Sequence, residues 1–562
     1  MPPWFHGPFP SLARSRGISG INLVLRMTSP FTLALQGVSF QLPSGEPLLS
    51  DLNETFDERR TALVGRNGVG KSVLARIMAG ELPASAGRCL ASGPVHYLPQ
   101  RIEPQAFRSV AELAGVQLLL DALTRVEAGG VDPADFERLD GHWDVRARLE
   151  AELAAAGLAH LLPDTPASRL SGGECTRVAL LGAWLSGADW LLLDEPSNHL
   201  DRAGREALRE QLQRWRGGLI LISHDRLLLD DMQRIVELSS SGLRSYCGGY
   251  AFYREIRQQE QDNAQRELQR RKLERDRQHH AMQEQRERQE HRQAKGHREA
   301  KQANQAKILV DRQKERSQTS IARLVTQQDE RRERLAREVH EAFGQLREDV
   351  AVVLNAPDCE LPESRGVLLL KALRLPFGNA APLDLQLSGP RRVAVSGRNG
   401  SGKSTLLKVI AGVLAPAAGS CEVRVRSAYL DQHLAALSPD RSVLELLQER
   451  NRVADPSVLR TRLAQLGLPA ARVELPSALL SGGERLKAAL ACELYAEHPA
   501  QLLLLDEPDN HLDLPSREAL ENLLRQYRGA LLVVSHDEAL LARLALEARL
   551  ECAENGWRWS VG

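Results

Sequence analysis

Two stretches of the chain combine glycines with a lysine and a serine in the spacing of a phosphate-binding loop. The first comprises Gly65, Arg66, Asn67, Gly68, Val69, Gly70, Lys71 and Ser72, and the second comprises Gly397, Arg398, Asn399, Gly400, Ser401, Gly402, Lys403, Ser404 and Thr405. Each follows a β-branched apolar run and precedes an amphipathic one, which is the strand-to-helix context of such a loop. Its backbone N–H groups bind phosphate oxygens, the lysine reaches the β- and γ-phosphates, and the serine hydroxyl binds Mg²⁺. The sequence therefore predicts two sites for nucleotide phosphates.

Two adjacent acids follow an apolar run in each half of the chain. Asp194 and Glu195 lie in LLLDEPSNHLD, and Asp506 and Glu507 lie in LLLDEPDNHLD. An aspartate at a strand end beside a phosphate loop can hold Mg²⁺ directly or through water. The glutamate that follows points elsewhere and is suited to polarise the attacking water. Surface charge at a strand end is the structural alternative, which the recurrence of the whole pattern disfavours.

The motifs recur at nearly constant separations, which indicates two copies of one domain. Gly65 and Gly397 are 332 positions apart, whereas Ser171 and Ser481, which lie in two LSGGE segments, are 310 apart. The first copy therefore contains about 22 additional residues between these motifs. We place them near residues 120–145 as a surface insertion, because surface loops tolerate added residues.

The order of the motifs resembles that of the ATP-binding cassette superfamily over nearly the whole chain. The resemblance rests on the phosphate loops, YLPQ and YLDQ, the LSGGE segments, DEP, NHLD and SHD. It implies an α/β fold of two P-loop cassettes in tandem, with ATP held between the phosphate loop of one cassette and the LSGGE segment of the other. The chain would then be an ATP hydrolase that uses ATP and Mg²⁺.

The resemblance also implies roles for individual residues. The ATP-binding residues outside the phosphate loops would be Gln100, Ser171, Gly172, Gly173, Glu174, Gln432, Ser481, Gly482, Gly483 and Glu484. The metal ligands would be Ser72, Gln100, Asp194, Ser404, Gln432 and Asp506. The catalytic residues would be Glu195 and Glu507, with His224 and His536 sensing the γ-phosphate. One site would pair Lys71 with Ser481 and Gly483, and the other would pair Lys403 with Ser171 and Gly173.

The second copy departs from the superfamily pattern at one position. Family members usually have Ser or Thr after DEP, where this chain has Asp509. An additional acid near the interface could weaken that site, or could make ATP hydrolysis there occur out of step with hydrolysis at the other site. The aromatic residues that would stack on adenine are not defined by the motifs; Phe40 and Phe377 are candidates, and each could equally be a core or surface residue.

A charged segment separates the two copies. Between Tyr250 and Phe343 it contains one glycine, Gly296, and no proline, and it is rich in helix-forming Arg, Gln, Glu and Lys. We predict two helices of about 40 residues that fold back as a hairpin near Gly296. Its tip, residues 291–307, has an excess of basic residues and no aromatic one. The basic residues are Arg292, Lys295, Arg298, Lys301 and Lys307.

A basic tip without aromatic side chains suits contact with the phosphates of folded RNA rather than base stacking. A solvated helical spacer is the structural alternative. Tandem cassettes joined by such a segment, with NHLD after DEP, resemble the ABC-F family. That resemblance implies a ribosome-binding ATPase whose linker enters the tRNA exit-site region, contacts rRNA and tRNA, and regulates or rescues translation, in some members with antibiotic protection. The resemblance also implies a monomer, in which the two cassettes of one chain pair with each other.

Two other functions fit the cassettes. One is the ATPase pair of an importer that docks on separate membrane subunits, and the other is a DNA-associated ATPase, which a basic hairpin could also serve. The net charge of zero gives no general attraction to nucleic acid, so any attraction must be local. No apolar run is long enough to span a bilayer and the seven cysteines form no CxxC pair, which favours a cytoplasmic protein.

The expected organisation has four parts. Residues 1–26 are an extension, or a miscalled start before Met27, where strand-like alternation begins. Residues 27–250 are the first cassette, residues 251–345 the charged helical linker, and residues 346–562 the second cassette.

Overall fold

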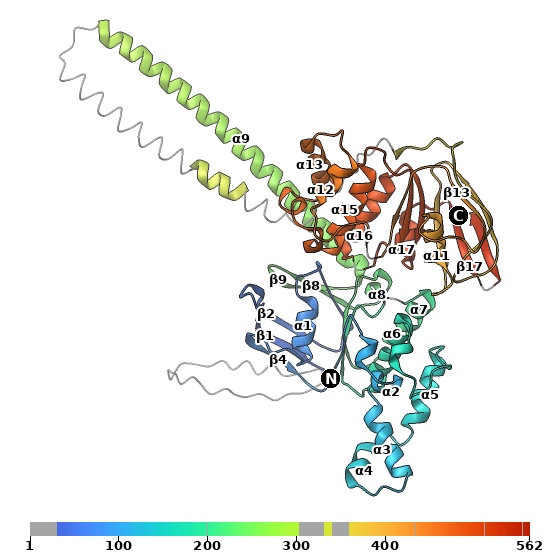
Figure 1. The fold of residues 1–562 in the computed structure, drawn as a ribbon. Helices are drawn as coiled ribbons and strands as arrows, with labels where there is room; N and C mark the ends of the chain where they lie inside the picture. Colours follow the sequence, from blue (N-terminus) through green and yellow to red (C-terminus); the bar gives the residue numbers. More distant parts are fainter. Residues whose placement is uncertain are drawn as a thin grey trace, which may run out of the picture.

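The computed structural model describes residues 31–198, 200–302, 331–339, 359–432, 434–510, 512–553 and 555–561. It shows two α/β cassettes and a long helix that leaves them (Figure 1). The N-terminal residues 1–26 and Lys307 of the predicted basic tip lie outside the described residues.

The first cassette is built on a six-stranded sheet and a smaller three-stranded sheet. The six-stranded sheet has the order β5-β6-β7-β3-β8-β9, and it is parallel except for β9, which is antiparallel to β8. Its strands are β3 (Thr61–Gly65), β5 (Val95–Leu98), β6 (Trp190–Asp194), β7 (Gly218–Ile222), β8 (Arg234–Ser239) and β9 (Gly242–Cys247). The three-stranded antiparallel sheet has the order β2-β1-β4, with β1 (Leu33–Gln41), β2 (Pro47–Phe56) and β4 (Ala86–Ala91).

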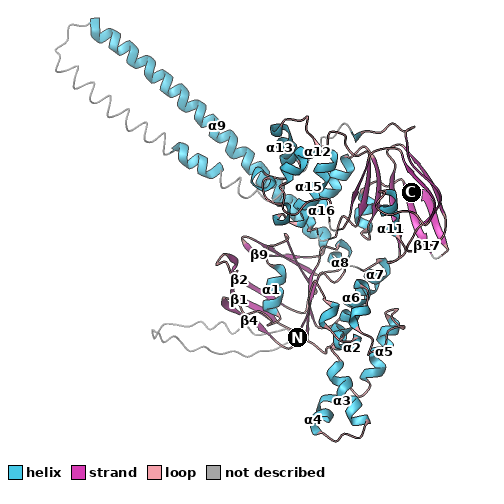
Figure 2. Cartoon of the chain, in the orientation of Figure 1, coloured by secondary structure: helices cyan, strands magenta, loops and turns pink. Residues whose placement is uncertain are grey.

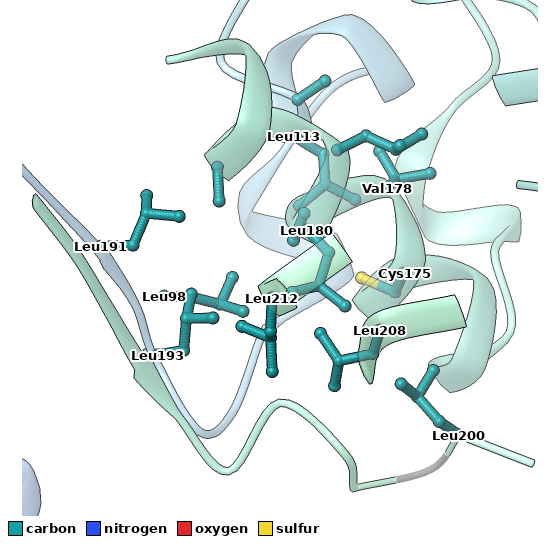
Figure 3. Packing of buried hydrophobic residues seen from close by; sticks show 14 of the residues in the cluster. Leu98, Leu113, Cys175, Val178, Leu180, Leu191, Leu193, Leu200, Leu208 and Leu212 are labelled. Carbon is teal, nitrogen blue, oxygen red and sulfur yellow. The ribbon is translucent and has the colours of Figure 1, made fainter. Parts of the chain in front are cut away.

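The apolar runs that precede the acids are the central strands of this sheet. Every residue of β6 and β7 is buried, as expected for parallel strands that are covered on both faces. Leu191 and Leu193 belong to the core that contains Val178 and Leu208, while Trp190 and Leu192 belong to the core on the opposite face. Figure 3 shows Leu191 and Leu193 on the strand facing the leucines of the neighbouring helices.

Helices pack on the sheet, and those between Gln100 and β6 share a hydrophobic core with it. The helices of this cassette are α1 (Lys71–Met78), α2 (Val110–Leu113), α3 (Gln117–Glu127), α4 (Pro133–Leu139), α5 (Val145–Ala155), α6 (Gly172–Leu185), α7 (Arg202–Arg214) and α8 (Arg226–Asp230). The helices α3 and α4 pack on each other (Figure 1). They cover most of the range in which we place the insertion, and the described residues of the second cassette contain no counterpart of α4.

The second cassette repeats this plan. Its sheets have the orders β14-β15-β16-β12-β17-β18 and β11-β10-β13. The strands are β10 (Gly366–Arg374), β11 (Leu383–Ser388), β12 (Arg392–Gly397), β13 (Ala418–Val423), β14 (Ser427–Leu430), β15 (Leu502–Asp506), β16 (Ala530–Val534), β17 (Ala548–Ala553) and β18 (Gly556–Val561). The helices are α11 (Lys403–Ile410), α12 (Val443–Arg450), α13 (Pro456–Gln465), α14 (Ala470–Val473), α15 (Gly482–Leu494), α16 (Leu514–Gln526) and α17 (Glu538–Arg543).

The linker begins as one continuous helix, α9 (Tyr250–Gln302), of 53 residues. Figure 2 shows it projecting well away from both cassettes. The predicted turn at Gly296 is wrong, because the helix passes through this residue and continues to Gln302. A single glycine costs about 1 kcal/mol relative to alanine in a helix, too little to break one flanked by strong helix formers.

A second helical stretch, residues 331–339, packs against α9. Arg271 of α9 contacts Glu338 at 2.6 Å, and the side chains of Leu268 and Leu335 are both buried. The described part of the chain contains no helix both long enough and apolar enough to cross a membrane.

Candidate active sites between the two cassettes

Both predicted phosphate loops join a central strand to a helix. The loop after β3 leads into α1, and the loop after β12 leads into α11. Gly70 and Gly402 are the N-caps of these helices with φ of 105° and 103°, a left-handed conformation that glycine adopts without strain. A Cβ on Gly65 would lie 2.3 Å from the carbonyl oxygen of Leu238, so this position also excludes a side chain. Each loop therefore directs backbone N–H groups and a helix N-terminus at one point.

The lysine of each loop is buried inside it. Lys71 Nζ donates to the carbonyl oxygens of Gly65 and Arg66 at 2.7 and 3.0 Å. Lys403 makes the equivalent bonds in the second cassette, at 2.8 and 2.9 Å. Burial lowers the pKa of both ammonium groups, while nearby acids raise it, so a buried cation lies at the centre of each loop.

The serine after each lysine contacts the aspartate that ends the neighbouring strand. Ser404 Oγ donates to Asp506 Oδ1 at 3.0 Å, and Tyr429 Oη donates to Asp506 Oδ2 at 3.1 Å. In the first cassette, Tyr97 Oη donates to Asp194 Oδ2 at 3.2 Å, and Ser72 bonds to the same carboxylate. Burial raises the pKa of both aspartates, and these hydrogen bonds lower it. A hydroxyl and a carboxylate beside a phosphate loop are a suitable donor set for Mg²⁺.

The glutamate after each aspartate has a strained backbone. Glu195 and Glu507 have φ of 51° and 50°, values that are uncommon for residues other than glycine. Each backbone N–H donates to the carbonyl oxygen that ends the adjacent strand, Ile222 at 2.8 Å and Val534 at 2.9 Å. Strain held in this way at the same place in both copies is typical of a functional site.

The side chain of Glu195 is almost completely enclosed. It is 9% exposed, and burial raises its pKa to about 7. Among the described residues its Oε1 atom has no hydrogen-bond partner, and it lies 3.5 Å from His224 Nε2. A buried, unpartnered carboxylate oxygen is suited to accept a proton from a water molecule or to orient one. Glu507 lies 3.6 Å from His536 and also accepts a hydrogen bond from Asn510 Nδ2.

Both histidines are buried beside their glutamates. Desolvation lowers the pKa of His224 well below its usual value, and it lowers that of His536 to about 4. Both rings are therefore neutral near pH 7, and each can donate or accept one hydrogen bond. They follow the ends of β7 and β16, next to the strands that carry the acids.

The LSGGE segments begin the helices α6 and α15. Ser171 and Ser481 are the N-caps, and each forms a capping box with the glutamate three residues later, Glu174 or Glu484. The serines and the glycine after each, Gly172 or Gly482, are exposed. This geometry presents a helix N-terminus to solvent, which suits phosphate oxygens. The pairing of Lys71 with Ser481 and Gly483, and of Lys403 with Ser171 and Gly173, remains a prediction.

An aspartate from each cassette contacts the phosphate loop of the other. The backbone N–H of Asn67 donates to Asp513 Oδ2 at 2.9 Å. Asp201 accepts the equivalent hydrogen bond from the backbone of Asn399. The two cassettes therefore face each other with each phosphate loop at the interface, as sites shared between cassettes require.

Five candidate residues remain: Gln100, Gln432, Phe40, Phe377 and Asp509. Gln100 is exposed and Gln432 half-buried at the ends of β5 and β14, near the aspartates, and their roles toward Mg²⁺ are untested. Phe377 is 69% exposed and precedes Gly378, which lies against the second phosphate loop, so its ring is available for stacking. Phe40 is partly buried and packs against the hydrophobic core of the first cassette that contains Trp190 and Leu192. Asp509 is buried and accepts a hydrogen bond from Ser535 Oγ at 2.8 Å.

The sequence reasoning missed three pairs of residues at the two sites. They are Tyr97 and Tyr429, Asp201 and Asp513, and Arg205 and Arg517. Their recurrence could have identified them, because each pair has the separation of its neighbouring motif, 332 for the tyrosines and 312 for the others.

Comparison with known proteins agrees with this geometry. A family model described as ABC transporter matches residues 49–198 and 380–510. The tylosin resistance ATP-binding protein TlrC of Streptomyces fradiae is 33% identical, over 89% of this chain and 96% of the relative. The energy-dependent translational throttle protein EttA of Mycobacterium tuberculosis is 31% identical, over 92% of this chain and 91% of the relative.

Solved structures support the fold. An archaeal ribosome recycling factor, aABCE1, in complex with the stalk protein aP1 is 19% identical with a TM-score of 0.57, covering 92% of this chain and 87% of the other. The phosphate loops, acids and interface thus define an ATP hydrolase with two ATP-binding cassettes. The chain belongs to the ABC-F family of tandem ATP-binding cassette proteins.

Proposed function

We propose that the chain is a cytoplasmic ATPase that binds the ribosome near the tRNA exit site and regulates or rescues translation. ATP binds at two composite sites and closes the cassettes, and hydrolysis permits their separation. The observation that carries the proposal is α9, which starts at the cassette interface and extends far from it (Figure 1). Two relatives support it, one named as a translational throttle and one for resistance to tylosin.

We call the ATP site that contains Lys71 the first site and the one that contains Lys403 the second site. The base of α9 contacts both cassettes next to the first site. Tyr250 Oη donates to Glu518 of the second cassette at 3.2 Å, while Arg257 pairs with Glu237 of the first at 3.1 Å. A cavity of about 310 Å³ is lined by the first phosphate loop, by Tyr253 and Arg257 of α9, and by Leu514 of the second cassette. Because both cassettes contact the base of α9, a change in the distance between the cassettes must change these contacts.

The residues proposed for catalysis are those that the two sites bring together. Glu195 and Glu507 orient the attacking water, and Lys71 and Lys403 bind the β- and γ-phosphates. His224 and His536 contact the γ-phosphate. Ser72, Ser404, Asp194 and Asp506, together with Gln100 and Gln432, are the proposed ligands of Mg²⁺. The ion would neutralise charge on the phosphate oxygens.

Closure of the cassettes requires a defined amount of binding energy. Moving an equilibrium from 1:99 to 99:1 takes about 5.5 kcal/mol of preferential binding to the closed form. Two ATP molecules, each contacted by both cassettes, can supply this energy, whereas ADP lacks the γ-phosphate contacts.

The test uses the double variant Glu195→Gln, Glu507→Gln, which should bind ATP and stay closed. We expect it to sediment with ribosomes in ATP and not in ADP. A chain that binds ATP but stays in the supernatant contradicts the ribosomal proposal. The same experiment with membranes and with DNA examines the importer and DNA-associated alternatives.

Protection from an antibiotic is a second aspect of the proposal, supported by the 33% identity with TlrC over nearly its whole length. Expression of the chain in a tylosin-sensitive host should raise the inhibitory concentration of tylosin, and the double glutamine variant should not. An unchanged inhibitory concentration at confirmed expression would separate this chain from resistance while leaving ribosome binding open to its own test.

A further inference from the structure

Arg205 and Arg517 occupy equivalent positions in α7 and α16, and each connects two loops of its own cassette. The Nε of Arg517 donates to the carbonyl oxygen of Leu512 at 3.2 Å, and its Nη1 donates to Asp537 at 3.1 Å. Arg205 makes the same two contacts with Leu200 and Asp225, both at 3.2 Å. All four ion-paired side chains are at most 11% exposed.

The two loops that each arginine connects belong to different ATP sites. Asp537 follows His536, which lies in the second site. Leu512 precedes Asp513, whose carboxylate accepts a hydrogen bond from Asn67 in the phosphate loop of the first site. Arg517 thus joins two loops. One contains His536 of the second site and is its histidine loop, and the other contains Asp513, which contacts the first site.

Arg205 makes the reciprocal connection. Asp225 follows His224 of the first site, and Leu200 precedes Asp201, which contacts Asn399 in the phosphate loop of the second site. The guanidinium groups also act across the interface. Burial raises the pKa of Glu195 and the charge of Arg517 partly offsets this, whereas burial lowers the pKa of His224 and His536 and the charges of Arg517 and Arg205, respectively, lower it further.

We propose that Arg205 and Arg517 are positioning residues for ATP hydrolysis. Each holds the aspartate-bearing loop of its own cassette against the phosphate loop of the other, so that the histidine loop at one site influences hydrolysis at the other. The proposal rests on the composite ATP sites of the proposed function but not on ribosome binding, because every measurement uses the chain alone.

A fork-shaped guanidinium is required for this role. Arginine presents several N–H groups in a fixed plane, so it contacts a backbone carbonyl and a carboxylate at once, whereas lysine presents a single point charge. Arg517→Lys therefore keeps the positive charge near Asp537 and Glu195 but holds only one of the two loops. Arg517→Met holds neither.

The test measures one site at a time. In a Glu507→Gln chain, hydrolysis comes from the first site, yet Arg517 lies in the second cassette. Arg517→Met removes both hydrogen bonds of the guanidinium, and the loss of even one hydrogen bond to a charged group corresponds to roughly tenfold or more. We therefore expect this variant to lower kcat by roughly tenfold or more, with a smaller change in KM. Arg517→Lys should restore only part of this activity. An unchanged kcat would overturn the proposal.

A double-mutant cycle separates positioning from general support of the fold. If Arg517 acts through Asp513, then Asp513→Ala lowers kcat of the first site and adding Arg517→Met lowers it little further. Reductions that multiply would overturn the proposal. The matched control is Arg234→Met, which removes a buried arginine paired with Glu54, away from both sites. It should lower the thermal midpoint without changing kcat of the folded chain.

The reciprocal experiment covers the case in which Arg517→Met fails to fold. Arg205→Lys in a Glu195→Gln chain should lower kcat of the second site, again without further reduction when Asp201→Ala is added. If Glu195→Gln and Glu507→Gln singly leave the total ATPase rate unchanged, the composite sites themselves are wrong, which is a different failure from an unaffected Arg205 or Arg517 variant.

Discussion

Arg226 of the first cassette donates a hydrogen bond to Glu521 of the second, and both side chains are buried. Glu521 also accepts from Arg543 of its own cassette at 2.8 Å. The guanidinium of Arg226 lies 5.7 Å from the ring centre of Tyr250, the first residue of α9. A single buried ion pair therefore connects the two cassettes and the base of the linker.

Removal of Glu521 should weaken the association of the cassettes. Breaking a buried ion pair typically costs about 3–5 kcal/mol, because the remaining charge is left without a partner. Since about 1.4 kcal/mol corresponds to a factor of ten, Glu521→Ala should need roughly 10²-fold more ATP for half-maximal hydrolysis. The control is Glu422→Ala, which removes an exposed partner of Arg424 in the same cassette. Exposed pairs contribute about 0–1 kcal/mol, so this variant should behave as the parent does. Equal ATP requirements in the two variants would contradict the prediction.

The two glutamates should contribute unequally to hydrolysis. Glu195 is more enclosed than Glu507, with side chains 9% and 23% exposed, and Glu507 shares a hydrogen bond with Asn510. We expect Glu195→Gln to lower the steady-state ATPase rate more than Glu507→Gln does, and the double variant to lower it by roughly 10²–10⁴-fold, as expected for removal of a general base. The three rates are measured by phosphate release, with ATP binding checked separately. Equal reductions in the two single variants would show that the difference in enclosure has no catalytic effect.

Asp509 should make the stability of the second cassette depend on pH. Burial raises its pKa and the charge of Arg517 offsets part of this shift, so the folded chain favours the neutral carboxyl more than the unfolded chain does. A group with a raised folded-state pKa stabilises the fold fully below its unfolded pKa, and this contribution is lost as the pH rises through the folded pKa. Asp509→Ser should therefore raise the thermal midpoint more at pH 8 than at pH 5.

The first cassette offers the matched control for this prediction. Ser197 occupies the equivalent position and is equally buried. Ser197→Asp should destabilise the chain more at pH 8 than at pH 5, the opposite of Asp509→Ser. If both substitutions act alike at the two pH values, the Asp509 carboxylate is fully stabilised by its neighbours and the prediction fails.

The cassettes could be predicted from the sequence because their chemistry is concentrated in short local motifs. A phosphate loop requires glycines at fixed spacing between a strand and a helix, and the acids follow runs such as LLLLD that form fully buried strands. Recurrence at a fixed separation could have identified the interface residues, but not what each of them contacts. Arg517 acts through contacts with Leu512 and Asp537, and its proximity to Glu195 depends on how two cassettes pack, which no local pattern encodes.

For the linker, the helical character could be predicted from the sequence but the position of the turn could not. Its helical character follows from composition, and the sequence predicts its turn at Gly296 because no other helix breaker lies between Tyr250 and Phe343. Helix continuity depends on the sum of propensities over many residues, and one glycine among Arg, Lys, Glu and Gln does not decide it. The contact of Arg271 with Glu338 joins residues 67 positions apart, a separation that helical periodicity alone could not specify.

Neutralising the basic residues near the far end of α9 should weaken binding to folded RNA. Arg292, Lys295, Arg298 and Lys301 lie on the last turns of this helix, and Lys295 is exposed. If they bind phosphates, changing all four to glutamine should lower affinity and flatten the dependence of binding on salt, by about one unit of log–log slope for each phosphate that is no longer neutralised. The measurement is the affinity for ribosomal RNA across a series of salt concentrations. The control changes four exposed basic residues nearer the cassettes on the same helix, Arg266, Arg270, Lys272 and Arg277. Equal effects from the two sets would mean that the helix attracts RNA only through its overall charge, whereas no effect from either set would make α9 a spacer.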